Sequence, residues 1–160
     1  DLHSFPTRRS SDLRFHGELS RVLKERDDVR VVIKNFSIHG DLSDAPARAV
    51  IAAKIQDNAK AAALVETLMT REYYSQADMK DRSKLAEKVK ANVLKFAKEA
   101  GLDVKQLEAD MQGEVVTREL ANVRGMAQEF EIKGTPFLII NEQAFPGAIP
   151  YSQIIDALKK

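Results

Sequence analysis

Apolar positions repeat with a helical period over most of this chain. Between Arg14 and Arg26 they fall on one face of a helix, at Phe15, Leu19 and Val22. Similar stripes follow along the chain, and they predict helices over residues 47–55, 64–68, 85–100, 104–111, 116–130 and 151–158. No such period is present before Arg14, so the start of the first helix cannot be placed from the pattern.

Residue types at the ends of these stripes predict how the helices begin and end. Ser43 or Asp44 is the expected N-cap of the helix at 47–55. Gly101 suits the left-handed position that ends a helix. Asp103 and Gln106 have the spacing of a capping box at the start of the next one.

Three short runs predict β-strands instead. "VRVVIKNF", at 29–36, is β-branched and nearly continuously apolar, as in a strand that is covered on both faces. Near the end, "FLII" at 137–140 and "QAF" at 143–145 flank a turn at Asn141 and Glu142. The order helix, strand, several helices, strand, strand, helix predicts an α/β fold with a helical insertion.

Composition narrows the functional classes. The chain is 44% hydrophobic and 31% charged, with 25 Lys and Arg against 24 Asp and Glu, and charges of both signs are interspersed. No basic stripe for nucleic acid and no apolar run of membrane-spanning length is visible. The chain has no cysteine, so it can form no disulfide, thiolate or zinc–thiolate site.

The stretch "EIKGTPFLIIN", at 131–141, is the most specific one. Pro136 cannot donate to a sheet ladder, so it belongs at the first position of the strand that follows. Gly134 permits a tight path before it, and a Thr135–Pro136 bond in this place can be cis. The alternative is that Thr135 and Pro136 have only a structural role, in a loop that joins a helix to a strand.

The order of these segments resembles the DsbA-like branch of the thioredoxin superfamily. The resemblance rests on "DVRVVIKNF", "AKEAGLDVKQLEADM" and "VRGMAQEFEIKGTPFLIINEQAFPGAIPYSQI", and it covers residues 14–160. It implies a first strand that ends in a C-x-x-C motif at the N-terminus of the first helix. There the helix dipole stabilises a thiolate, which exchanges with disulfides through a mixed disulfide.

The resemblance also implies a substrate site. Gly134, Thr135 and Pro136 match the loop that hydrogen-bonds the substrate backbone as an extended strand. His16 lies where a side chain could tune the thiolate, although a helix-surface histidine is the alternative. Cysteine-containing protein substrates, a redox partner and a periplasmic or exported location are implied, whereas no metal, nucleotide or organic cofactor is.

Neither the strand nor the C-x-x-C stands before Arg14 in this chain. Residues 1–13, "DLHSFPTRRSSDL", resemble translated sequencing-adapter sequence of the kind that contaminates metagenomic assemblies. We therefore expect a non-native tail at 1–13 and a truncated DsbA-like domain at 14–160, with its helical insertion at about 44–113. No catalytic residue is expected in the chain as written.

Three functions remain open from the sequence. The parent protein could be a thiol–disulfide oxidoreductase of the cell envelope. A cysteine-free module that binds peptides at Pro136 without redox turnover is the second, and a non-redox enzyme, such as an isomerase or a glutathione-transferase relative, is the third. The residues that precede Arg14 in the parent discriminate between them.

The missing strand generates a stability prediction. In the family it lies between the runs at 29–36 and 137–140, so its loss leaves buried backbone groups unpaired at a cost of ~1–3 kcal/mol each. Because total stability is only ~5–15 kcal/mol, we expect a marginal or partly unfolded chain. Thermal circular dichroism checks this, and a cooperative melt above ~50 °C with full near-UV ellipticity would contradict it.

Overall fold

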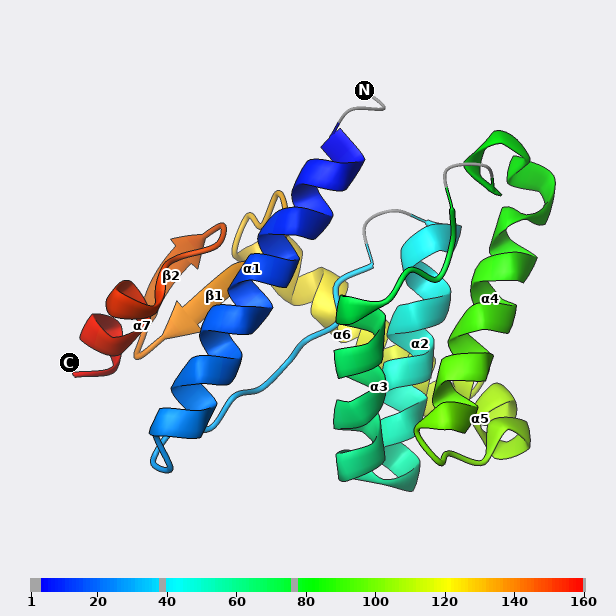
Figure 1. Cartoon of the computed structure of the whole chain (residues 1–160), viewed down its shortest axis with the longest axis horizontal. Coiled ribbons are helices and arrows are strands. Elements are labelled where there is room, and N and C mark those ends of the chain that lie inside the picture. The colour runs from blue at the N-terminus through cyan, green and yellow to red at the C-terminus, as the bar shows by residue number, and fades with distance from the viewer. Residues whose placement is uncertain (1–3, 38–39, 76–77, 160) are drawn as a thin grey trace. The chain divides into compact units, whose positions relative to one another are not determined.

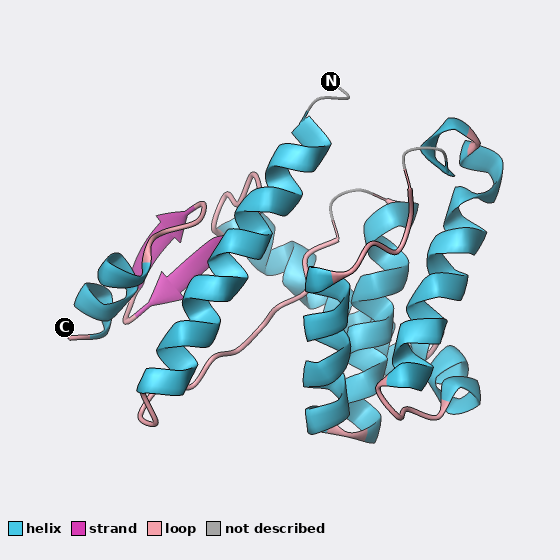
Figure 2. Cartoon of the chain, viewed as in Figure 1, coloured by secondary structure: helices cyan, strands magenta, loops and turns pink. Residues whose placement is uncertain are grey.

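The computed structural model describes residues 4–37, 40–75 and 78–159, and most of them are helical (Figures 1 and 2). In chain order the elements are α1 (Ser4–Glu25), α2 (Asp41–Gln56), α3 (Asn58–Thr70), the short 3-10 helix η1 (Asp78–Lys80), α4 (Arg82–Glu99), α5 (Val104–Met111), α6 (Glu114–Glu129), β1 (Phe137–Ile140), β2 (Gln143–Pro146) and α7 (Tyr151–Leu158). Within the described part of the chain, no helix has the length and apolar character needed to cross a membrane.

The chain divides into two compact units. We call residues 1–33 with 129–160 the hairpin unit, and residues 34–128 the helical unit. The hairpin unit holds α1, the β1–β2 hairpin and α7. The insertion expected at 44–113 lies within the helical unit, which also includes α6 as far as Gln128.

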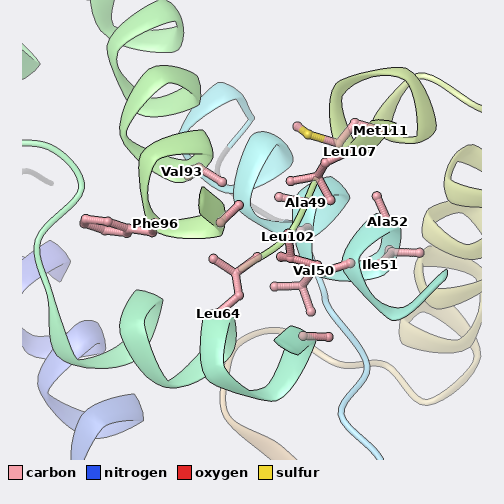
Figure 3. Close-up of a cluster of buried hydrophobic side chains, with 14 of the residues drawn as sticks. Ala49, Val50, Ile51, Ala52, Leu64, Val93, Phe96, Leu102, Leu107 and Met111 are labelled. Atoms are coloured by element: carbon pink, nitrogen blue, oxygen red, sulfur yellow. The ribbon is translucent and has the colours of Figure 1, made fainter. Parts of the chain in front are cut away.

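Helix α2 is the centre of the helical unit, and α3, α4 and α5 all pack against it. Figure 3 shows apolar side chains from these helices pointing toward one another. The largest side chains that are fully buried in this core are Leu64, Val89, Val93, Leu107, Met111 and Val116. Each comes from a stripe that the helical period had identified, so the pattern predicted this core.

The junction between α4 and α5 is closed by backbone hydrogen bonds. Gly101 has φ 80°, and the N–H of Leu102 donates to the carbonyl of Ala97 at 3.1 Å, which is the Schellman motif. Asp103 caps α5 by accepting from the N–H of Gln106 at 3.0 Å. The expected cap residues Gly101 and Asp103 are therefore confirmed.

The second hydrogen bond of the expected capping box, from the backbone N–H of Asp103 to the side chain of Gln106, does not form. Gln106 bonds to Asp110 rather than to the backbone of Asp103. The N–H of Asp103 donates instead to the side-chain amide oxygen of Gln56, at the end of α2, at 3.0 Å. The amide nitrogen of Gln56 donates to the carbonyl of Asp103, also at 3.0 Å. A residue distant in sequence has replaced the local one, and its two hydrogen bonds join α2 to α5.

The predicted start of α2 is also wrong. Gly40 is the N-cap, rather than Ser43 or Asp44, because the N–H groups of both residues already donate to the carbonyl of Gly40 at 3.0 and 2.9 Å. Pro46 then lies inside the helix, where it removes one backbone hydrogen bond. Asp44 instead holds Arg48 on the next turn, at 2.7 Å.

The strand predicted at 29–36 does not form. Over the described residues the sheet has two strands, β1 and β2, while residues 29–37 are assigned to neither helix nor strand. Val32 is 59% and Ile33 39% exposed. The β-branched pattern was a sound local signal, but a strand forms only beside another strand, and no described segment pairs with this run.

Helix α1 begins at Ser4, about ten residues before the apolar period starts. Pro6 falls in its first turn, where a backbone N–H needs no partner within the helix. Residues 7–13 contain neither glycine nor proline, so nothing stops the helix there. Residues 1–3 of the expected tail lie outside the described residues.

A pair of glycine substitutions tests the backbone of the helical unit. Gly101→Ala forces an L-residue to φ 80° and should lower the free energy of unfolding by ~1–2 kcal/mol. Gly125→Ala places a methyl group in open space within α6, and should raise the free energy of unfolding by ~0.5–1 kcal/mol. Urea denaturation measures both, and the same sign for the two variants would contradict this account of Gly101.

Candidate functional site

The loop before β1 contains the residues predicted to bind substrate. Gly134, Thr135 and Pro136 are all partly exposed, and the Thr135–Pro136 peptide bond is cis. A Cβ on Gly134 would meet nothing within 4 Å, so the space beside this loop is open. The three residues are therefore partly accessible to solvent directly ahead of β1.

Two sets of hydrogen bonds hold this loop. The N–H of Gly147 donates to the carbonyl of Pro136 at 2.9 Å, which joins the loop before β1 to the loop after β2. The antiparallel ladder continues from there, with Phe137 opposite Pro146 and Ile140 opposite Gln143. The loop is therefore fixed to the hairpin at the point where β1 starts.

The tight turn of the hairpin confirms the predicted strand–turn–strand arrangement. Asn141 and Glu142 have φ of 45° and 68°, as a type I′ turn requires of its two central residues. The Asn141 side chain also donates to the carbonyl of Ala157 at 3.2 Å, and this bond joins the hairpin to α7. Ile154 and Ala157 are buried, so one face of α7 lies in the interior of this unit.

A polar cluster joins α1 to α7 in the same unit. Tyr151 donates its hydroxyl hydrogen to the Glu25 carboxylate, and Arg21 pairs with Glu25 at 2.9 Å. The guanidinium of Arg21 also lies over the Tyr151 ring, 4.0 Å from its centroid. We call Arg21, Glu25 and Tyr151 the α1–α7 clasp.

The clasp shifts the ionisation of its members. The hydrogen bond from Tyr151, and then that from Arg21, hold the pKa of Glu25 below its usual value. The same bond to Glu25, with burial, raises the pKa of Tyr151. The clasp therefore contributes stability above the usual carboxyl pKa and loses it as pH falls through the lowered pKa of Glu25. At the alkaline end it is lost as pH rises through the raised pKa of Tyr151.

Sequence reasoning missed the clasp. Arg21 and Glu25 are one helical turn apart, a spacing that favours an ion pair. The pairing of these two residues could therefore have been predicted from the sequence. Tyr151 is 126 residues from Glu25, and no local pattern links the two. His16, the other residue singled out near the site, is partly buried on α1. Its influence on a thiolate stays a prediction.

The described residues offer few groups for covalent or metal chemistry. The sequence has no cysteine, so no thiolate is available. Across residues 4–37, 40–75 and 78–159, no group of three His, Asp or Glu side chains is placed to hold a metal ion. The described residues therefore show neither a thiol nor a metal centre at this loop.

Comparisons with known proteins place these features in a family. The model of a family described as DSBA-like thioredoxin domain matches residues 42–159. Among curated proteins, none matched the chain.

Two solved structures are similar over nearly the whole chain. A thioredoxin-like oxidoreductase from Silicibacter pomeroyi DSS-3 is 31% identical, with a TM-score of 0.78, over 92% of this chain and 76% of its own. Proteus mirabilis ScsC in a compact conformation is 21% identical, with a TM-score of 0.71, over 93% of this chain and 74% of its own, and at that identity it shows the fold alone. The expected α/β thioredoxin-like fold with a helical insertion is confirmed.

Removing the tyrosine hydroxyl tests the electrostatics of the clasp. In Tyr151→Phe the pKa of Glu25 should rise toward its usual value, because the hydrogen bond that contributes most to the shift is gone. Carbon-detected NMR titration of the Glu25 carboxyl measures this. Tyr74→Phe, in the helical unit, is the matched control and should leave the Glu25 pKa unchanged. An unshifted pKa in Tyr151→Phe would show that the clasp does not form in solution.

Proposed function

Since the chain belongs to the DSBA-like thioredoxin domain family, we propose that it is the scaffold and substrate-binding part of a protein-disulfide oxidoreductase. Gly134, Thr135 and Pro136 hold an extended segment of the substrate by its backbone. The observation that carries this is the accessible loop ahead of β1, fixed at its base by the hydrogen bond from Gly147 to Pro136. Backbone recognition accepts many sequences, as an enzyme of general disulfide exchange requires.

The covalent chemistry needs two thiols. One thiolate attacks a sulfur of the substrate disulfide, forms a mixed disulfide and expels the other substrate sulfur as a thiolate. The second enzyme thiolate then attacks the mixed disulfide, which frees the reduced substrate and leaves the enzyme disulfide. Because this chain has no cysteine, it can perform neither step. The proposal is therefore that the chain as written is inactive in redox turnover.

The proposal assigns the two cysteines of the parent protein to a C-x-x-C directly before Arg14. The family chemistry places that motif at the N-terminus of a helix, where the helix dipole lowers the thiol pKa. In the present chain residues 10–13 lie inside α1, which begins at Ser4. The proposal thus requires that the helix of the parent start near Arg14, with a strand in front of it.

Location and partners follow by the same reasoning. Disulfides of protein substrates form and persist in oxidising compartments, so we propose that the parent protein works in the periplasm or outside the cell. Its partners are cysteine-containing proteins and a second redox protein that restores the active form of the C-x-x-C. No organic cofactor enters these steps.

The absence of cysteine favours a second candidate. A natural protein with this sequence would bind extended peptides at Thr135 and Pro136 without turnover. Sequencing the source DNA across the codon for Arg14, with long reads, separates the two. A strand-like apolar run that ends in C-x-x-C supports the oxidoreductase, whereas encoded "DLHSFPTRRSSDL" supports the peptide-binding module.

Enzyme assays then test the site itself. The chain as written should not accelerate dithiol-dependent reduction of a disulfide-bonded protein such as insulin, and any catalysed rate would refute the proposal. The chain preceded by the recovered strand and C-x-x-C should catalyse it, and replacing both cysteines with serine should return the rate to the blank.

A substitution in the predicted binding loop tests its role in the protein that carries the recovered strand and C-x-x-C. Thr135→Arg should raise KM about tenfold and change kcat little, because it obstructs substrate binding without touching the thiols. Thr70→Arg, at an exposed position ending α3, is the matched control and should leave KM unchanged. Equal KM for Thr135→Arg and the unsubstituted protein would remove the loop from the substrate site.

A further inference from the structure

The connection between α1 and α2 contains a stretch of accessible chain. Residues 26–37 belong to neither helix nor strand, and Figure 2 draws them as a loop. Arg30, Val32 and Lys34 in this stretch are exposed, and Val32 is exposed by 59%. Exposed loops are where proteases cut folded proteins, because the enzyme must reach the backbone on both sides of the bond that it breaks.

The backbone of this stretch is available for new hydrogen bonds. Residues 29–32 make no backbone hydrogen bond within the part of the chain that the structure describes. The β-branched side chains at 29, 31 and 32 favour an extended backbone. An enzyme that holds its substrate as an added strand needs extended backbone with unpaired N–H and C=O groups. Residues 29–32 therefore suit a protease cleft without prior unfolding.

Arg30 is the residue of this stretch that a protease can select. Its neighbours at 29, 31 and 32 are all valine, and its guanidinium makes no hydrogen bond or ion pair with the described residues. The other cations of the loop are already paired. Arg26 donates to Asp28 at 2.6 Å. Lys34 donates to Glu119 at 2.8 Å. An acidic S1 pocket therefore finds one available partner, and this partner is an arginine.

Other cations outside the regular helices are placed less well for cleavage. Lys133 is exposed, but Glu131 just before it has φ 51°, which is not extended, and Pro136 after it has no N–H to donate. Arg71, which follows α3, is paired with Glu99. Most remaining Lys and Arg lie in helices, whose backbone groups already bond to one another.

We propose that residues 29–34 are a proteolytic processing site, cleaved after Arg30 by an endoprotease of trypsin-like specificity. The Arg30–Val31 peptide bond breaks, and one water supplies the hydroxyl of the new carboxyl group at Arg30 and a hydrogen of the new amine at Val31. The α1–α7 clasp and the packing of α1 against α7 then hold α1 without a covalent link. This site does not rest on the function proposed for the loop before β1.

Limited digestion of the full chain tests the site. With a small amount of trypsin, the first products seen by intact mass spectrometry should be residues 1–30 and 31–160. Arg30→Gln should slow the first cut about tenfold or more, because the S1 pocket loses its charged partner. Lys133→Gln, which removes an exposed loop cation elsewhere in the same unit, is the matched control and should leave the rate unchanged. A first cut at another position, or an unchanged rate in Arg30→Gln, would overturn the proposal.

The urea dependence separates this site from cleavage of unfolded chains. Because residues 29–32 need no unfolding, the rate of the cut after Arg30 should change little up to about 1 M urea. Cleavage that requires global unfolding instead accelerates with the unfolded fraction. An Arg30 cut whose rate rises in parallel with loss of helical circular dichroism would refute a site that exists in the folded chain.

Discussion

The close approach of four helices depends on small side chains along α2. Ala49, Ala52 and Ala53 are all fully buried, at a relative exposure of 0%. Because an alanine extends only one carbon from the backbone, α3, α4 and α5 can all pack against the same helix at close distance. Larger side chains, such as Leu64 and Leu107, come from the surrounding helices and fill the spaces between them. The helical unit is therefore built around a thin central helix.

The end of α2 is positioned by contacts with α5. Gln56 holds both backbone groups of Asp103, and Arg48 donates to the carbonyl of Met111 at 3.0 Å. These contacts bind the two ends of α5 to positions of α2 that are about two helical turns apart.

Local information was sufficient for most of the fold. The helical stripes placed the core because an apolar face every 3.6 residues is a property of the segment itself. The glycine at 101 and the Asn141–Glu142 turn were predictable for the same reason, since each depends on a few neighbouring dihedral angles. By contrast, the run at 29–36 depends on a partner strand, and its β-branched composition could not supply one.

The candidate site could be predicted only in part from the sequence. The place of Pro136 directly ahead of β1 was predictable because proline cannot donate to a sheet ladder. The substrate-binding role of Gly134, Thr135 and Pro136 comes from the family resemblance and stays a prediction. Tyr151 and Gln56 were missed because each bonds to a residue far away along the chain. The early start of α1 was missed for a different reason. Residues 4–13 of this helix have no helical period of apolar residues, so the sequence pattern did not reveal them.

The two edges of the β1–β2 hairpin are chemically unequal. The strand β2 ends in Pro146, which cannot donate to a further strand, and so its edge is blunted. The strand β1 is the uncharged sequence Phe-Leu-Ile-Ile, with Ile139 51% exposed, and its outer edge has no strand beside it among the described residues. Natural sheets guard such edges with charge or proline. In concentrated solution we therefore expect the outer edge of β1 to be a site at which copies of this chain form intermolecular sheets.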